Sequence, residues 1–461
     1  MAWSSLHSRW TTLVLCGGLI GCTPAGPGRL SLDPSTVVVR GVHLLDPAHL
    51  DASRDKVDVL IQDGVIKGIF DVDTGPSGAR SIDGTGRTLM PGLVDAHTHL
   101  GSPASVPGTM SLPDTTANLA GWASAGVTTI FDMGGRIGPN RELATKVDAG
   151  LIVGPRIHSA PLPLTARGGH PIPAAKALLP AMLSGLVEKL VIQVDGPDDA
   201  EAAVATAVAG GADYVKIIVD DLPGTSPKLD GPTVAALIAA AHTRGLKVAV
   251  HVGSPEDLRV ALAGGADLLA HLPHSAPLSE ADVELVVASG VPVVATLAGF
   301  QAAKTLSSGT WSPSPLDRQL GWGALSDALV ADAAQTFAET PVLQALADSV
   351  HPGMAGSVAA LAAAGAVVYV GSDAPLPASW PGSGLHHELD ALRSAGIASN
   401  TLLSVVTTGP AVALGTGPAR APLGVGSPAD LVLVDGDPQA RFEDVHEVSV
   451  VWIGGRQVSA P

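Results

Sequence analysis

Short apolar runs alternate with Ala- and Leu-rich stretches of helical period through the central part of the chain. Several runs are almost continuously apolar, as expected for parallel strands that helices cover on both faces. The eight runs are 93–99, 128–133, 156–160, 214–219, 247–252, 268–272, 292–297 and 367–373. Helices are predicted at 115–125, 197–210, 232–244, 255–264, 279–289, 352–364 and 385–396. Strands and helices that alternate eight times predict an α/β fold, a (β/α)8 TIM-like barrel.

The segments before and after this repeat are β-rich. Asp63-Gly64 is a strong two-residue hairpin signal between two apolar stretches. Strands are predicted at 37–39, 57–62, 65–70, 430–434 and 448–453. Because neither end alone would make a convincing sheet, we expect residues 35–90 and 421–461 to combine into one small β-sandwich domain, beside a barrel of residues 91–420.

Two stretches, 161–196 and 298–350, are longer than a simple strand–helix unit requires. They follow the third and the seventh predicted strand, so they emerge on the face where barrel enzymes place their active sites. We therefore expect lids or specificity loops there rather than separate domains.

The amino terminus resembles a bacterial lipoprotein signal. Arg9 precedes an apolar stretch, 10–20, that is too short to span a bilayer comfortably, and small residues surround Cys22. We expect residues 1–21 to be a signal peptide, Cys22 to be lipidated and residues 22–34 to form a tether. These features predict a location in the bacterial cell envelope, on the periplasmic side or at the outer membrane. The alternative is an ordinary secretory signal with a chance cysteine.

Composition narrows the function classes. The 461-residue chain is 46% hydrophobic and 15% charged, with 54 Gly and 37 Pro, which fits an α/β enzyme with short connections. A formal net charge of −17 disfavours a nucleic-acid partner. Cys16 and Cys22 are the two cysteines, so a mature chain would have no thiol for catalysis or for a cysteine-based metal site.

Candidate chemistry lies at the carboxyl ends of the predicted strands. His97 and His99 end the first run two residues apart, so both side chains point to the same face of the strand. Two imidazoles that project together suit a borderline-soft divalent metal such as zinc. The alternative is a pair of hydrogen-bonded or exposed histidines without a ligand.

His251 and His271 end the fifth and the sixth run, and Asp373 ends the eighth. Small or apolar residues flank both histidines, where an unpaired imidazole would be poorly solvated. A lone histidine of this kind is more often a core residue, and an Asp after a strand is more often a cap or a turn residue. Their common position on the barrel end that carries His97 and His99 favours one ring of metal ligands.

Lys216 lies within the fourth run, among apolar residues. Lysines are almost never fully buried without a partner, so two arrangements are open. One is an ion pair with a carboxylate such as Asp220 or Asp373. The other, which we favour, is a carbamate formed from the amine and carbon dioxide, which would turn the cation into an oxygen ligand able to bridge two metals.

Together these residues resemble the amidohydrolase superfamily, in its imidazolonepropionase-like and metal-dependent Xaa-Pro dipeptidase (prolidase) branch. The resemblance covers nearly the whole mature chain and is specific to the superfamily, not to a substrate. It is carried by the segments that look like its first, fourth, fifth, sixth and eighth barrel strands and its return into the small β domain, which are 86–99, 212–217, 245–251, 270–271, 371–374 and 422–432.

The resemblance implies roles for the candidate residues. One or two divalent ions, expected to be Zn²⁺, would be caged by His97, His99, Lys216, His251, His271 and Asp373. His97, His99 and Asp373 would hold the first ion, His251 and His271 the second, and the carbamate of Lys216 would bridge them. A metal-activated hydroxide would attack the scissile carbonyl, while Asp373 would be the catalytic base and then the acid that protonates the leaving nitrogen.

The long loop after the third strand contains a further match. Residues 168–170 resemble a family motif whose histidine lies near the substrate, which implies a substrate contact for His170. Arg167 beside it is a candidate partner for a substrate carboxylate; the alternatives are a solvent-facing histidine and a surface arginine. Residues 219–223 depart from the small, Gly-rich stretch of dipeptidase relatives, and His274 is an extra histidine. These departures bear on the substrate rather than on the chemistry.

Three functions compete. The first is a metal-dependent amidohydrolase that cuts an amide or peptide bond in a small substrate, such as an Xaa-Pro dipeptide or an N-acyl amino acid. The second uses one metal and an uncarbamylated Lys216 on a cyclic amide such as an imidazolone or a lactam. The third is a non-catalytic cell-envelope binding lipoprotein, whose signature would be a missing ligand. We expect a small-molecule partner, no nucleic acid and membrane contact only through the lipid anchor; association into a homo-oligomer is open.

Overall fold

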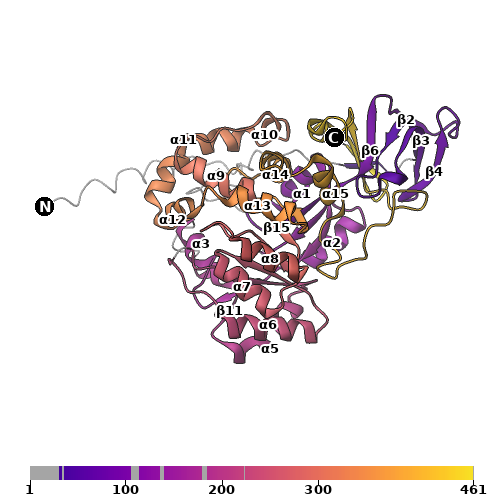
Figure 1. Ribbon diagram of the computed structural model, residues 1–461. Helices are drawn as coiled ribbons and strands as arrows, with labels where there is room; N and C mark the ends of the chain where they lie inside the picture. Colours follow the sequence, from indigo (N-terminus) through magenta and orange to yellow (C-terminus); the bar gives the residue numbers. More distant parts are fainter. Residues whose placement is uncertain are drawn as a thin grey trace, which may run out of the picture.

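The computed structural model describes residues 31–33, 36–104, 114–134, 140–178, 184–222 and 224–459. The predicted signal peptide, Cys22 and most of the predicted tether lie outside these residues. Within them, no helix is both long and apolar enough to cross a bilayer. The described chain forms a helix-covered barrel with a β-rich lobe at one side (Figure 1).

All eight predicted barrel strands are present, and the hydrogen-bonded neighbours among them run parallel. In chain order they are β7 (Leu93–Thr98), β8 (Val127–Asp132), β9 (Arg156–Ser159), β12 (Val215–Val219), β13 (Val248–Val252), β14 (Leu268–Leu269), β15 (Val293–Ala295) and β16 (Val368–Val370). The ring closes just past β16, where the Asp373 amide donates to the carbonyl of His97 at 2.8 Å and the His99 amide to that of Ala374 at 2.7 Å. The predicted (β/α)8 barrel is confirmed.

The long stretch after β9 contains two short strands that were not predicted from the sequence. β10 (Leu164–Ala166) pairs in parallel with β12 and with β11 (Ile192–Val194). Two helices, α3 (Ile172–Leu178) and α4 (Ser184–Val187), and the 3-10 turn η3 (Glu188–Leu190) connect them. Part of the predicted lid is therefore built into the barrel sheet, and His170 leaves the sheet just after β10.

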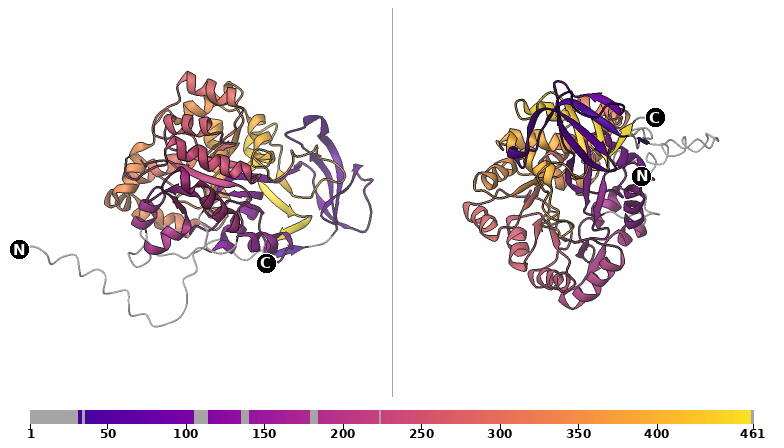
Figure 2. Two further views of the ribbon diagram at one scale, coloured as in Figure 1. Left: turned by 90° about the horizontal axis from the view of Figure 1, so that it is seen from below. Right: turned by 90° about the vertical axis from the view of Figure 1, so that its right-hand side faces the viewer.

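Helices cover the outside of the barrel (Figures 1 and 2). They are α1 (Thr115–Ser124), α2 (Asn140–Asp148), α5 (Ala200–Ala209, after the 3-10 turn η4, Pro197–Asp199), α6 (Gly231–Thr243), α7 (Pro255–Gly264), α8 (Glu280–Ser289), α13 (Met354–Ala363), α14 (Ser383–Ser394) and α15 (Ser399–Thr408). Of these, α2 and α15 were not predicted. Capping boxes start α7 at Ser254 and α8 at Ser279, where the serine and the third helical residue exchange hydrogen bonds and satisfy the first free amides.

The inside of the barrel is filled by a separate apolar cluster rather than by solvent. It consists of small and large side chains from the strands, among them Ala96, Phe131, Tyr214, Ala249, Ala270 and Val294. These residues precede the polar ones on the same strands or on neighbouring strands. The barrel is therefore a packed core that presents chemistry only at the carboxyl ends of its strands, as is general for this fold.

The second long stretch, after β15, forms a helical insert rather than a loop. Its helices are α9 (Leu297–Ser307), α10 (Pro315–Gln319), α11 (Gly323–Glu339) and α12 (Pro341–Ser349), and they lie together at one side of the barrel (Figure 1). A separate apolar core joins the insert to the segment after β16, where the indole rings of Trp322 from the insert and Trp380 stack with centroids 6.1 Å apart. Because α9 begins directly after a barrel strand, the insert is tied to the functional end of the barrel.

The β-rich lobe combines strands from both ends of the chain. Its strand order is β1-β19-β18-β17-β6-β2-β3-β4, with β5 beside β2, and Figure 2 shows the indigo and the yellow strands together. The strands are β1 (Ser31–Asp33), β2 (Val37–Leu44), β3 (Arg54–Gln62), β4 (Val65–Asp71), β5 (Arg80–Asp83), β6 (Arg87–Pro91), β17 (Leu431–Asp435), β18 (Val448–Ile453) and β19 (Arg456–Ser459). Val39, Val59, Leu433 and Trp452 share its buried core. β1 falls within the predicted tether but is the edge strand of this sheet, paired with β19.

A histidine pair connects the barrel helix α14 to the 3-10 turn η5 (Phe442–His446) beside the lobe. Nδ1 of His386 lies 2.8 Å from Nδ1 of His446, and Nε2 of His386 donates to the carbonyl of Ala125 at 2.9 Å. His446 in turn contacts Asp390 at 3.0 Å. Burial, reinforced by the charge of His446, lowers the pKa of His386 to about 3, so this ring is neutral in the folded protein.

Acid should destabilise the fold through His386. The unfolded state takes up a proton near an ordinary histidine pKa of about 6.5, while the folded state does not, so stability falls as the pH drops below that value. Through this residue the wild type should lose about 2 kcal/mol of unfolding free energy between pH 7 and pH 5. We expect His386→Gln, which can still donate to Ala125, to lack this part of the loss. Urea unfolding at the two pH values measures this. An acid sensitivity equal to that of the wild type would contradict it.

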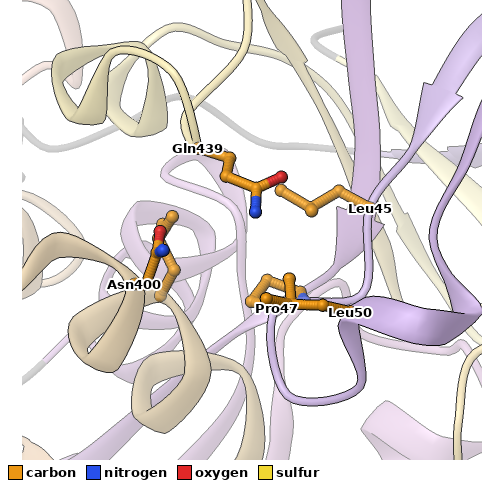
Figure 3. A pocket seen from close by; sticks show the side chains of 6 residues that line it. Leu45, Pro47, Leu50, Asn400 and Gln439 are labelled. Carbon is orange, nitrogen blue, oxygen red and sulfur yellow. The ribbon is translucent and has the colours of Figure 1, made fainter.

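A small pocket opens between the lobe side of the barrel and α15 (Figure 3). It is lined by Leu45, Pro47, Leu50, Asn400, Leu403 and Gln439, with Leu50 in the 3-10 turn η1 (Leu50–Ala52). These lining residues carry no titratable group and none is a predicted site residue. We assign the pocket no chemistry.

Candidate metal centre

The two histidines at the end of β7 face Asp373. Nε2 of His99 lies 2.8 Å from Oδ1 of Asp373, and Nε2 of His97 lies 3.3 Å from the same oxygen. Nδ1 of His99 lies 2.9 Å from the carbonyl of Gly134, which can only accept, so Nδ1 carries the proton of the neutral ring. In the neutral ring the Nε2 lone pair faces a carboxylate oxygen, as two ligands of one cation do. Without a cation, burial opposes a charge on His99, but the contact with Asp373 outweighs it and raises the pKa of this ring.

Several polar atoms here are buried without a hydrogen-bond partner: both ring nitrogens of His97, Oδ1 of Asp373, Nζ of Lys216 and Nδ1 of His170. Burial, followed by the charges of Lys216 and His99, holds the pKa of His97 well below its usual value, so this ring is neutral. Buried polar atoms almost always have a partner. A divalent cation would supply one, so the residues present fit a metal.

Local backbone features aim these side chains. The pairing of β7 with β8 shifts register between Asp95 and Thr98, an irregularity that commonly re-aims side chains near active sites. Gly371 makes room for the first histidine, because a Cβ there would lie 2.7 Å from Cβ of His97. Asp95 accepts hydrogen bonds from the amide and the hydroxyl of Ser372, at 2.9 and 2.6 Å, and so holds the residue before Asp373. This supporting role of Asp95 was not predicted.

His271 lies between the predicted ligands from the two sides of the ring. Its ring centroid is 4.2 Å from that of His97 and 4.5 Å from that of His251. Nε2 of His271 is 4.0 Å from Oδ2 of Asp373, while its Nδ1 is 2.7 Å from the hydroxyl of Thr296. Thr296 directly precedes α9, so the insert begins at a residue that orients this histidine.

Lys216 is buried in β12 and carries an amine without a hydrogen bond. Burial lowers the pKa of Lys216 to about 7, although the charge of Asp373 acts in the opposite direction. Ile218 of β12 lies opposite His251 of β13. Because side chains alternate along a strand, Lys216, two residues before Ile218, points to the same face of the sheet as His251. Among the described residues no carboxylate forms an ion pair with Lys216. The amine is therefore neutral in a substantial fraction of molecules, and the neutral amine is the form that reacts with carbon dioxide.

His251, at the end of β13, contacts two residues that approach from neighbouring segments. Its Nε2 donates to Oδ2 of Asp220 at 3.0 Å, and the ring of His170 stacks on it with centroids 5.1 Å apart. His170 thus lies beside the ring of predicted ligands, with a pKa that burial, helped by the charge of His251, lowers to about 3. Its contact with substrate stays a prediction.

Arg167 has a different position from that of His170. Its guanidinium pairs with Asp195 through two hydrogen bonds of 2.6 and 2.5 Å, and its side chain is 65% exposed. The structure thus brings His170, but not Arg167, into contact with the predicted metal ligands. The pairing of Arg167 with a substrate carboxylate also stays a prediction.

Two residues at this end of the barrel received no role in the predicted site. Asp220 directly follows β12, and His274 follows β14; both are buried and in contact with each other. The signal for Asp220 was in the sequence, because polar residues directly after barrel strands had identified the other ligands. His274 lies three residues past His271, and only the folded structure shows its partner.

The comparisons with known proteins agree with this geometry. The Amidohydrolase family matches residues 88–458 of the chain. The chain belongs to the amidohydrolase family. The family predicted from the sequence is confirmed, and with it the class that the family name describes, a hydrolase of carbon–nitrogen bonds.

Solved structures share the fold of this amidohydrolase. A prolidase complexed with N-methylphosphonate-L-proline superposes with a TM-score of 0.68 at 24% identity, over 93% of this chain and 100% of the other. Molinate hydrolase superposes with a TM-score of 0.69 at 19% identity, over 92% and 95%. At these identities the likeness shows the fold alone.

Curated relatives match only a short part of the amidohydrolase. A dihydroorotase from Desulforapulum autotrophicum is 36% identical over 67 residues, which is 14% of this chain. The match spans about 15% of the length of that relative. The activity and the substrate are therefore not transferred from it.

Proposed function

We propose that this amidohydrolase cuts an amide or peptide bond in a small substrate with the help of one or two divalent metals, expected to be Zn²⁺, at the carboxyl end of its barrel. The observation that carries the proposal is the contact between His99 and Asp373, whose Nε2 and Oδ1 lie 2.8 Å apart beside His97, a buried ring without a hydrogen-bond partner. A shared cation is the simplest partner for such a pair.

The chain offers two groups of ligands. His97, His99 and Asp373 would hold the first metal; His251 and His271 would hold the second, with a carbamate on Lys216, formed from carbon dioxide, between the two. A bound divalent cation lowers the pKa of water to about 7 and polarises a carbonyl. The Lys216 amine is buried without a hydrogen-bond partner. A charge on it would lower the pKa both of His97 in the first group and of His251 in the second, which supports a position between the two groups.

Asp373 is the catalytic residue in this proposal. Its Oδ1 faces the two histidines of β7, which leaves Oδ2 to take a proton from the water that adds to the carbonyl carbon. As the carbon–nitrogen bond breaks, the same oxygen returns the proton to the leaving nitrogen. The products are a carboxylic acid and an amine, with one water consumed.

For the substrate we propose an Xaa-Pro dipeptide or an N-acyl amino acid. Structures described as a Xaa-Pro dipeptidase with bound methionine and as a prolidase complexed with N-methylphosphonate-L-proline share the fold, which supports the choice of dipeptides. The second candidate is a cyclic amide cut with one metal and an uncarbamylated lysine. The group His97, His99 and Asp373 needs no carbamate to hold an ion, and the short stretches similar to dihydroorotases favour testing this class.

The experiment is a screen of dipeptides, N-acyl amino acids and cyclic amides with metal-replete protein, combined with the metal content per chain. About two equivalents of zinc, with activity that zinc restores to the metal-free protein only when bicarbonate is present, would support the bridged pair. About one equivalent, with turnover of cyclic amides, would support the second candidate. Turnover that a chelator leaves unchanged would contradict both.

We also propose that the protein is anchored to the bacterial cell envelope through a lipid on Cys22. We expect the full chain, expressed in a bacterium, to incorporate labelled palmitate and to fractionate with membranes, and Cys22→Ala to lose the label. Cys16→Ala serves as the matched control and should keep it. A wild-type chain that is exported without label would show an ordinary secretory signal instead.

A further inference from the structure

A buried row of four side chains connects the metal centre to the helical insert, and the mechanism above does not use it. Oδ2 of Asp220 accepts from Nε2 of His251 at 3.0 Å and from Nε2 of His274 at 3.4 Å. Nδ1 of His274 lies 3.0 Å from the hydroxyl of Ser349, the last residue of α12. The ring of His274 also stacks on Phe300 of α9, with centroids 5.0 Å apart. Two helices of the insert therefore hold the far end of the row.

The backbone around Asp220 is shaped to hold its carboxylate. Oδ1 accepts a hydrogen bond from the amide of Leu222 at 2.9 Å, and Leu222 has a φ of 44°, which is uncommon for a leucine. Gly253, just past β13, leaves the space that the carboxylate fills, because a Cβ there would lie 2.2 Å from Oδ1. Asp220 as a whole residue is 3% exposed. A side chain packed this closely has little freedom to move.

Asp220 is an anion in this environment. The groups within hydrogen-bond distance of its two oxygens are two imidazole nitrogens and a backbone amide, all of which can donate. A buried carboxylate is tolerated only when its oxygens are paired. Here the two imidazole N–H groups provide that pairing.

Asp220 could instead be a metal ligand, because Asp220, His170 and His251 lie close enough together to surround a cation. The hydrogen bonds favour a different role. Oδ2 already accepts from two imidazoles and Oδ1 from a backbone amide. With Nε2 of His251 donating to Asp220, the neutral ring keeps its lone pair on Nδ1, the nitrogen left for a metal. A carboxylate on the other nitrogen of a metal-binding histidine is a common orienting contact.

We propose that Asp220 is a positioning residue: it holds His251 with Nδ1 free for the second metal, and His274 and Ser349 link this position to the insert of residues 297–349. The proposal rests on the proposed function, since it assigns an orienting partner to a ligand of that metal. The insert thereby takes part in metal binding through a ligand's partner, although it contributes no ligand itself.

The test is the affinity for Zn²⁺, measured on the full chain by competition with a chelator, together with the visible spectrum of the Co²⁺-substituted protein. Asp220→Asn removes the charge, and Gly253→Ala displaces the carboxylate without changing any polar group. We expect each to weaken binding of one Zn²⁺ by about 10–100-fold and to alter the Co²⁺ spectrum. Ser349→Ala, at the half-buried end of the row, should produce a smaller loss in the same direction.

Asp282→Asn is the matched control. Asp282 is equally buried, but it caps α8 and pairs with Arg259, so this variant should bind Zn²⁺ as the wild type does. Thermal unfolding shows which variants fold; should Asp220→Asn fail to fold, Gly253→Ala and Ser349→Ala carry the test.

Two results would overturn the positioning role. One is wild-type affinity and an unchanged spectrum in the folded variants. The other is a full loss of one Zn²⁺ from both Asp220→Asn and Gly253→Ala at saturating metal, which would make Asp220 a ligand. A wild-type chain that binds no Zn²⁺ would instead overturn the proposed function.

Discussion

Replacing Asp373 with asparagine should lower kcat by about 10⁴-fold, at the upper end of the range for general acid–base catalysis, because the same carboxylate both transfers the proton and holds a metal. Asparagine has nearly the same shape and also tolerates the left-handed backbone of this position, where φ is 58°. The amide of residue 373 still donates to His97, so the ring closure between β16 and β7 is kept. The loss should therefore appear in turnover and not in folding.

The measurement is steady-state kinetics on the best substrate of the screen, with thermal unfolding of the same samples. Asp282→Asn, which removes a buried carboxylate from the cap of α8, should keep wild-type kcat. Equal turnover by Asp373→Asn and the wild type would remove Asp373 from the mechanism. The carboxylate would then be needed neither for proton transfer nor as the metal ligand that His97 and His99 share.

Replacing Lys216 with methionine should abolish the bridging carbamate and at the same time stabilise the metal-free protein. Burial of the amine holds its pKa at about 7 instead of the ordinary 10.5, a difference that corresponds to about 5 kcal/mol. Methionine has a similar shape and no charge to desolvate. We expect a gain of at least about 2 kcal/mol in the unfolding free energy at pH 7, together with a large loss of activity.

The pH dependence gives a second readout for Lys216. Between pH 7 and pH 10 the unfolded wild type carries a proton on this amine that the folded protein lacks, so the stability of the metal-free wild type should rise with pH in this range. The methionine variant should lack this rise. Urea unfolding in buffers free of carbon dioxide and metal tests both points, and ¹³C NMR with labelled bicarbonate tests the carbamate.

Lys228→Met is the control, because that amine is half-buried and pairs with Asp257 at 2.8 Å, which outweighs burial and raises its pKa. Its removal should not stabilise the protein. A Lys216→Met protein less stable than the wild type would show that the buried amine has a favourable partner in the folded state.

The apolar pattern was enough to locate every barrel strand, because strands covered on both faces need continuous apolar runs wherever the rest of the chain folds. The same reasoning placed His97, His251 and His271 at one end of the barrel, since the carboxyl ends of parallel strands meet at one face. It did not find β10 and β11, which are three residues each and are held by pairing with β12 and with each other rather than by their own pattern.

The sequence by itself determined the architecture and the types of side chain at the barrel end, because both follow from local periodicity and from position along single strands. Only the tertiary structure decided which polar groups pair: Asp220 with His251 and His274, Arg167 with Asp195, and Asp95 with Ser372. These choices depend on distances between segments far apart in the chain and on how burial changes the cost of each charge. No local pattern encodes either quantity.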